Sequence, residues 1–234
     1  MAAAYSLPRM FTPKPLPPDT KPRLTVCNDF LLPEDIYEKN LFLAYYHHLK
    51  TRPDLLILLD KTRNIAADYQ PQDLVSVKGA LKLRAEAAEA FNTMVQAAQK
   101  DGITLVPQSA YRGYKYQDYI YNRSLKLRGR EYTDKYIAAP GHSQHQLGLA
   151  IDINDMRQTF ENSPASAWLA KHAGEYGYSM SFPKGDEDKT GFTYEPWHYR
   201  YITRAGTDMQ RDFFNDSQYD MLSFFAGCFA VADI

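Results

Sequence analysis

Apolar residues that recur every three or four positions predict several helices along the chain. The longest such pattern covers residues 77–100, and Gly102 follows it as a natural stop. Shorter stretches of helical character predict further helices. They cover residues 33–49, 114–127, 165–176, 207–214 and 217–231. The chain is therefore expected to be rich in helix.

Short apolar or alternating runs between these helices predict strands. They cover residues 55–59, 103–106, 149–153, 178–182, 191–194 and 198–202. A loop rich in Gly, Pro and His is expected over residues 128–147. Strands and helices do not alternate regularly and no internal repeat is present, which favours a single α+β domain with a small antiparallel sheet flanked by helices.

The N-terminal part differs from this pattern. Residues 7–22 contain six prolines and little apolar periodicity, a composition typical of an extended arm. We therefore expect a proline-rich arm over residues 1–22 and a domain over residues 23–234. The first residues lack a basic stretch followed by an apolar one, so they do not resemble a secretory signal.

Composition narrows the classes of partner. Charged residues make up 24% of the 234 residues and the net charge is −1, with no block of like charges. This argues against a nucleic-acid surface or a polybasic membrane surface. The apolar run without charge near the C-terminus, residues 221–232, is too short to span a bilayer. Cys27 and Cys228 lack metal-ligand spacing, and either two separate thiols or one bridge fits them.

A chain of this size hides about 70–75% of the surface that its unfolded form exposes, so it needs no metal merely to hold a core. Any metal site would therefore point to chemistry. In the predicted strand at 149–153, Leu149, Ile151 and Ile153 share the face expected to meet the core. Asp152 lies on the opposite face among small residues, with room for His145 to approach. Imidazole and carboxylate together suit Zn²⁺.

The sequence Glu195-Pro196-Trp197-His198 carries the second candidate group. On an unbroken strand Glu195 and His198 would point to opposite faces, so a shared role requires a turn, which Pro196 favours. His145, Asp152 and His198 could then hold a metal with one open position, and Glu195 could act as a general base beside it.

A third candidate is Arg112, which lies in a predicted turn between a strand and a helix. Its guanidinium could stabilise an oxyanion or bind a substrate carboxylate through two parallel hydrogen bonds. The alternative is a structural arginine paired with a surface carboxylate.

Three motifs in order carry a family resemblance: Ser-x-Tyr-Arg at 109–112, Ser-x-His-x-x-Gly-x-Ala-x-Asp at 143–152, and Glu-Pro-Trp-His at 195–198. The chain resembles the VanY-type D-alanyl-D-alanine carboxypeptidases over residues 55–225. These enzymes belong to a zinc-peptidase group with lysostaphin-like enzymes, D-Ala-D-Ala dipeptidases and hedgehog domains. The resemblance places a zinc site on the small sheet.

The resemblance implies a role for each matching residue. His145, Asp152 and His198 would hold Zn²⁺, and Glu195 would be the catalytic base. Arg112 would stabilise the developing oxyanion. The terminal D-alanine would be held by Gln117 and Ser143.

One pair of residues departs from the family pattern. Relatives usually carry Arg-Tyr before the proline that is Pro183 here, whereas this chain has Ser181-Phe182. A charge and a hydroxyl often found near the substrate cleft are therefore absent, and this bears on the peptide preference.

Other residues near these motifs have simpler interpretations. His142 is expected to support the site rather than bind metal, and Trp197 to form a wall. The seven tyrosines between Tyr111 and Tyr136 could line a groove for sugar and peptide, or pack in partly buried positions.

The expected activity is that of a zinc carboxypeptidase that removes the C-terminal D-alanine from peptidoglycan stem peptides. An L,D-carboxypeptidase acting on tetrapeptide stems, a D-Ala-D-Ala dipeptidase, and a non-enzymatic zinc-containing binding or signalling module remain as alternatives. Such a substrate favours an extracytoplasmic location, although the sequence does not encode one and a cytoplasmic location stays open.

Overall fold

The computed structural model describes residues 32–228, so the predicted arm at 1–22 and the predicted domain start at 23 lie outside the described residues. A four-stranded antiparallel sheet forms the centre, in the order β3 (Pro107–Ser109), β4 (Ala150–Ile153), β6 (His198–Tyr201), β5 (Tyr178–Met180). A separate two-stranded hairpin consists of β1 (Leu74–Lys78) and β2 (Leu81–Arg84). The predicted α+β class and the antiparallel sheet are confirmed.

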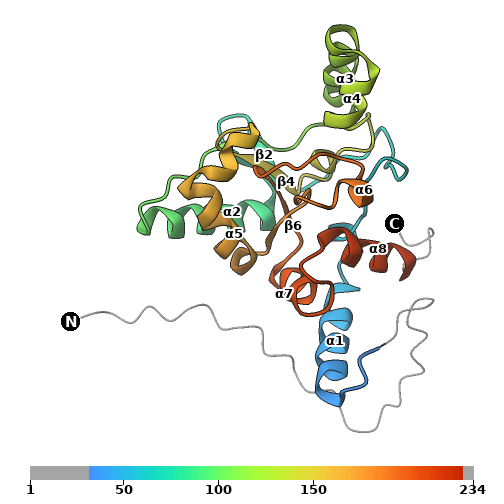
Figure 1. Cartoon of the computed structure of the whole chain (residues 1–234), viewed down its shortest axis with the longest axis vertical. Coiled ribbons are helices and arrows are strands. Elements are labelled where there is room, and N and C mark those ends of the chain that lie inside the picture. Colours follow the sequence, from blue (N-terminus) through green and yellow to red (C-terminus); the bar gives the residue numbers. More distant parts are fainter. Residues whose placement is uncertain (1–31, 229–234) are drawn as a thin grey trace.

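Helices cover the sheet and extend the molecule at both ends (Figure 1). They are α1 (Ile36–Leu49), α2 (Ala85–Lys100), α3 (Tyr114–Arg128), α4 (Arg130–Tyr136), α5 (Pro164–His172), α6 (Glu187–Thr190), α7 (Arg204–Phe213) and α8 (Gln218–Cys228). Four short 3-10 turns lie between them, at Pro53–Leu55, Gln144–Leu147, Gln158–Asn162 and Ala173–Tyr176. None of the helices in the described part is long and apolar enough to cross a membrane.

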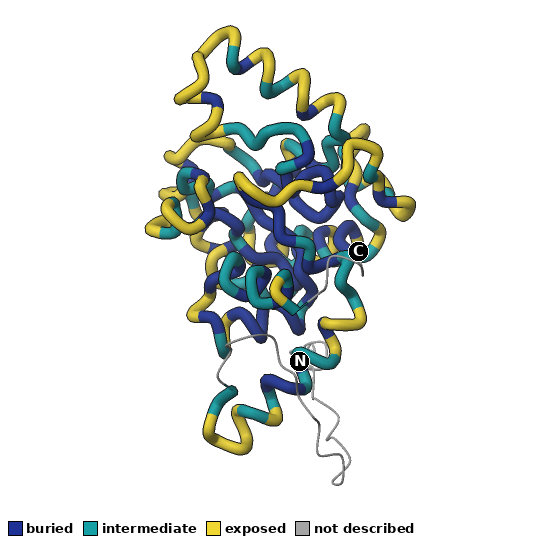
Figure 2. The backbone as a smooth tube through the Cα atoms, turned by 90° about the vertical axis from the view of Figure 1, so that its right-hand side faces the viewer, coloured by how far each residue is buried: buried dark blue, intermediate teal, exposed yellow. Residues whose placement is uncertain are grey.

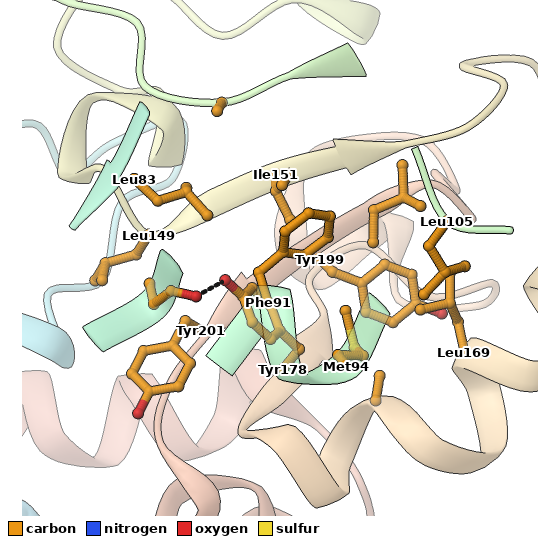
Figure 3. Close-up of a cluster of buried hydrophobic side chains, with 14 of the residues drawn as sticks. Leu83, Phe91, Met94, Leu105, Leu149, Ile151, Leu169, Tyr178, Tyr199 and Tyr201 are labelled. Carbon is orange, nitrogen blue, oxygen red and sulfur yellow. Dashed lines mark hydrogen bonds between the residues drawn. The ribbon is translucent and has the colours of Figure 1, made fainter. Parts of the chain in front are cut away.

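One face of the sheet packs against α2 and α5 in the larger of two apolar clusters (Figure 3). Leu149, Ile151 and Ile153 point into this cluster, as the alternation of the sequence predicts. Helix α2 buries Phe91 and Met94 on the stripe that meets them. The hydroxyl of Tyr178 enters the cluster and donates a hydrogen bond of 2.6 Å to the carbonyl oxygen of Ala87. The opposite face of the sheet is thereby left for polar side chains.

The second cluster joins α1, α7 and α8 below the sheet (Figures 1 and 2). Phe42, Met209 and Phe225 are fully buried there. At the end of α8, Cys228 is disulfide-bonded. The only other cysteine of the sequence, Cys27, lies outside the described residues.

The predicted strand at 55–59 is wrong. Its residues are all apolar because the segment lies between the two apolar clusters and contributes side chains to both. Leu55 and Leu59 pack in the larger cluster, whereas Leu56 and Leu58 pack in the second one. The segment pairs with no strand and begins with a 3-10 turn, Pro53–Leu55.

The predicted helix at 77–100 starts eight residues too early. Residues 77–84 belong to the β1–β2 hairpin, where Gly79 has a φ of 56° in the turn. A left-handed backbone of this kind interrupts a helix and suits a tight hairpin turn. The helix α2 therefore begins at Ala85.

Two further strand predictions are wrong, and the helices α4 and α6 were not predicted. Residues 103–106 form no strand, and the side chain of Asn154 binds their backbone instead. It accepts a hydrogen bond from the Val106 amide and donates one to the Thr104 carbonyl oxygen. Residues 191–194 follow the left-handed end of α6 at Gly191 and form no strand. The predicted loop at 128–147 contains α4.

We expect Phe91→Ala to lower the free energy of unfolding by about 3–5 kcal/mol, because it leaves a cavity under the sheet. Urea unfolding followed by circular dichroism measures the change. Tyr37→Ala on α1 is the matched control, since this side chain is 74% exposed. A loss as small for Phe91→Ala as for the control would contradict the assigned core.

Candidate metal centre

Asp152 and His198 come together because they are directly opposite each other on β4 and β6. Side chains opposite each other in an antiparallel pair lie on the same face, and here it is the face turned away from the apolar cluster. Both residues are buried, at 4% exposure each. Nδ1 of His198 lies 3.0 Å from Oδ1 of Asp152.

His145 reaches the same point from the short turn Gln144–Leu147, immediately before β4. Ser143 caps this turn, because its hydroxyl oxygen accepts a 3.3 Å hydrogen bond from the His145 amide. The turn ends at Gly148, whose φ of 68° reverses the chain into the strand. Nε2 of His145 then lies 3.3 Å from Oδ2 of Asp152.

The hydrogen bonds of the two imidazoles determine which nitrogens face Asp152 without a proton. Nδ1 of His145 lies 2.7 Å from the Ala110 carbonyl oxygen, which can only accept, so Nδ1 carries the hydrogen. The neutral ring therefore presents the lone pair of Nε2 to the carboxylate. Nε2 of His145 is buried and has no hydrogen-bond partner.

His198 repeats this arrangement with its nitrogens exchanged. Its Nε2 lies 3.1 Å from Oε1 of Gln144, and donation to that oxygen leaves the lone pair of Nδ1 toward Asp152. Two lone pairs and a carboxylate facing one another in a buried site repel, and a cation between them removes the repulsion. The ligand atoms of the three residues lie within 4.8 Å of one another, so they form a candidate metal site.

The protonation states suit metal binding. Burial lowers the pKa of His145 to about 4, and the neighbouring Arg112 guanidinium contributes in the same direction. The ring is therefore neutral near pH 7. The imidazoles of His145 and His198 and the Asp152 carboxylate are a donor set that suits zinc and leaves a position open.

Glu195 lies beside this group without belonging to it. The chain turns between Glu195 and His198, as predicted, with the His198 amide donating a 3.1 Å hydrogen bond to the Glu195 carbonyl oxygen. Oε2 of Glu195 is 3.8 Å from Nδ1 of His198. Burial raises the pKa of Glu195 to about 7, although His198 and Arg112 work in the opposite direction. A carboxyl group of this kind can both take up and release a proton near neutral pH.

Arg112 lies in the predicted turn between β3 and α3, and its amide donates to the His145 carbonyl oxygen at 3.2 Å. Its Nε is buried and has no hydrogen-bond partner. Burial lowers the pKa of Arg112, while the charges of Asp152 and Glu195 raise it. A surface ion pair, the alternative interpretation, does not describe this guanidinium.

These residues line a cavity of about 210 Å³. Gln117 and Ser143 also line it, and both are buried. Gln117 donates to the Ala138 carbonyl oxygen at 2.7 Å, and its Oε1 is left without a partner. His142 and Trp197 form further parts of the wall. The cavity thus brings together the seven residues to which the sequence analysis gave a role in metal binding, catalysis or substrate binding.

The sequence analysis missed Gln144, which holds His198 through the 3.1 Å contact. The hydroxyl of Ser181 donates to Oε1 of Gln144 at 2.7 Å. The ring of Phe182 packs against the imidazole of His198, with centroids 4.9 Å apart. The two residues that depart from the family pattern therefore both support this histidine. The position of Gln144 between Ser143 and His145 was the one available signal.

Comparison with known proteins agrees with this geometry. Residues 80–204, more than half of the sequence, match the family described as VanY, D-alanyl-D-alanine carboxypeptidase. The chain belongs to the VanY family. A relative from Bacillus subtilis, named "Putative carboxypeptidase YodJ", is 30% identical over 209 residues, which are 83% of this chain and 77% of the relative.

Solved structures of the VanY family and its neighbours share the fold. The LD-carboxypeptidase LdcB aligns with a TM-score of 0.66 and 32% identity, covering 75% of this chain and 87% of LdcB. A mutant of the vancomycin-resistance D,D-pentapeptidase VanY in complex with Zn(II) aligns with a TM-score of 0.62 and 25% identity. That alignment covers 72% of this chain and 99% of the other.

We expect Gln144→Leu to weaken metal binding by about 10–100-fold, because Nε2 of His198 loses its acceptor and the ring can turn. Competition with a chromophoric chelator measures the affinity for Zn²⁺ directly. Gln99→Leu on the exposed face of α2 is the matched control. Equal affinities for the two variants would show that Gln144 does not orient His198.

Proposed function

We propose that this VanY-family protein is a zinc-dependent carboxypeptidase that removes the C-terminal D-alanine from peptidoglycan stem peptides or their precursors. The observation that carries the proposal is the pair of unprotonated imidazole nitrogens facing Asp152, with Glu195 and Arg112 at the same cavity. An extracytoplasmic location would follow from this substrate.

In this proposal His145, Asp152 and His198 hold the zinc ion. Bound zinc would supply a Lewis acid that polarises the scissile carbonyl and makes water more acidic. Glu195 takes a proton from the attacking water and passes it to the leaving amine of D-alanine, in keeping with a pKa raised to about 7. Both steps use the same carboxyl group, which the turn at 195–198 holds near the ligands.

Arg112 acts on the carbonyl oxygen. Its free Nε–H lies in a buried site, where a donor aimed at a developing negative charge is worth more than in water. Gln117, with its unpartnered Oε1, and Ser143 bind the terminal D-alanine.

An L,D-carboxypeptidase acting on tetrapeptide stems is the second candidate. It is supported by the similarity to LdcB, whose structure is described as an LD-carboxypeptidase. Both candidates remove a terminal D-alanine, and they differ in the length of the stem and in the stereochemistry of the residue before the scissile bond. A dipeptidase and a non-enzymatic module are less well supported, because a module that uses metal only for shape needs neither Glu195 nor Arg112.

Defined tri-, tetra- and pentapeptide stems test the proposal. We expect release of one D-alanine from the pentapeptide, detected by mass spectrometry, and loss of this activity on metal chelation. Cleavage of the tetrapeptide alone would favour the L,D alternative. Absence of any released amino acid or dipeptide would refute the enzymatic proposal.

We expect Glu195→Gln to lower kcat by at least about 10²–10⁴-fold, since the amide retains size and polarity but cannot accept the proton. The zinc content, measured by mass spectrometry of the metal, is expected to stay at the wild-type level. Loss of zinc from this variant would instead make Glu195 a ligand.

We expect Arg112→Lys to lower kcat by about 10²–10³-fold with a smaller change in KM, because lysine cannot reproduce the planar donor geometry. Steady-state kinetics on a free and a C-terminally amidated pentapeptide measure both constants. If the loss appears mainly as weaker binding of the free peptide, Arg112 binds the terminal carboxylate instead. Wild-type rates would exclude both roles.

A further inference from the structure

The helices α3 and α4 form a hairpin that projects from the body of the molecule beside the metal centre (Figures 1 and 2). Most of its residues are exposed. The two helices meet through a hydroxyl pair, Ser124 and Thr133, with oxygens 2.8 Å apart, and through the Tyr121 hydroxyl, which donates to the Asp134 carboxylate. Several large side chains of the hairpin are left exposed.

Four tyrosines are exposed on this hairpin and lie in two pairs. Tyr116 and Tyr119 stack on α3, with ring centroids 6.3 Å apart and an angle of 19° between the rings. Tyr132 and Tyr136 form a second pair on α4, with centroids 4.6 Å apart. These four rings are 38–58% exposed, and we call them the tyrosine surface.

One pair begins at the metal-centre cavity and leads away from it, because Tyr136 lines the cavity itself. The other pair lies on α3, where Tyr116 directly precedes Gln117 of the cavity wall. The base of the hairpin also supplies Gln117 and Ile120 to the cavity wall. A molecule bound in the cavity can therefore continue onto the tyrosine surface.

The hairpin is also positively charged in a protein whose net charge is −1. Residues 114–136 contain six basic and three acidic residues. Of the acidic ones, Asp134 pairs with Arg130 at 3.8 Å. Lys115, Arg123 and Lys126 are exposed and form no ion pair with any residue in the described part of the chain. This charge favours a partner that carries carboxylates or other anionic groups.

We propose that the α3–α4 hairpin binds the glycan strand that carries the stem peptides, so that the enzyme works on polymeric peptidoglycan. The inference rests on the proposed function, because it identifies the part of the substrate that lies outside the cavity. Tyrosine offers rigid, amphipathic contact area, and sugar rings present apolar C–H faces with hydroxyl edges. The basic residues meet carboxylates of the stems along the strand.

The dimensions agree with this arrangement. A stem of five residues spans at most about 17 Å when extended. Helix α3, with 15 residues, is about 22 Å long. When the C-terminal end of a stem lies at the metal centre, the sugar at its other end is therefore still within the length of the hairpin.

The test compares polymeric and soluble substrates with the full chain. The double variant Tyr119→Ser with Tyr132→Ser removes one ring from each pair and spares the residues that line the cavity. The matched control is Tyr37→Ser on α1, an exposed tyrosine far from the hairpin (Figure 1). Co-sedimentation with insoluble peptidoglycan gives Kd, and kinetics on a soluble pentapeptide give kcat/KM.

We expect the double variant to raise Kd for polymeric peptidoglycan at least about fivefold, as the loss of two aromatic contacts implies. The value of kcat/KM on the soluble peptide is expected to stay within about twofold of wild type. A second variant, Arg123→Ser with Lys126→Ser, is expected to weaken binding and to reduce its dependence on salt. Circular dichroism checks that each variant is folded.

Unchanged binding in the double variant, or an equal loss in the Tyr37 control, would overturn the proposal. A fall in kcat/KM on the soluble peptide as large as the rise in Kd for polymeric peptidoglycan would also overturn it, because the tyrosines would then contribute to binding in the cavity. Binding to anionic lipid vesicles but not to peptidoglycan would identify a membrane surface instead. If wild type releases nothing from any stem, the proposed function fails, while tyrosine-dependent co-sedimentation still supports the glycan surface.

Discussion

The candidate metal site depends on the mutual repulsion of three buried groups. Nδ1 of His198 and Nε2 of His145 face the Asp152 carboxylate over 3.0 and 3.3 Å, in a place that water does not reach freely. The Ala110 carbonyl oxygen lies against Nδ1 of His145 and Oε1 of Gln144 lies against Nε2 of His198, so each ring turns its other nitrogen toward the carboxylate. A cation between the three groups would remove the repulsion.

Several levels of structure support this arrangement. The register of β4 and β6 places Asp152 opposite His198, and the larger apolar cluster fixes that register from the other face. The support continues through Gln144 and Ser181 to Gln218 on α8, whose amide donates to the Ser179 carbonyl oxygen at 3.1 Å. One candidate metal ligand, His198, is therefore held in place by parts of the chain that are far apart in sequence.

The sequence predicted the fold class, the face of β4 and the group of residues at the site, because alternation and motif spacing are local signals. The prediction of secondary structure failed where the same apolar pattern fits more than one kind of local structure. The leucines at 55–59 resembled a strand, and the hairpin at 74–84 merged with the periodicity of α2. The roles of Gln144 and Ser181 could not be predicted, because they depend on long-range contacts. Ser181 lies 37 positions after Gln144, and His198 lies 54 positions after it. The metal-binding roles of His145, Asp152 and His198 stay predictions, as do the roles of Glu195, Arg112, Gln117 and Ser143.

The segment at 55–59 has a consequence for how the molecule loses its structure. Its leucines alternate between the cluster under the sheet and the cluster of α1, α7 and α8. Neither cluster can open without removing side chains that the same five residues contribute to the other. We therefore expect the two clusters to unfold as one cooperative unit, so that the candidate metal site shares the thermodynamic stability of residues 32–228 rather than that of a local subdomain.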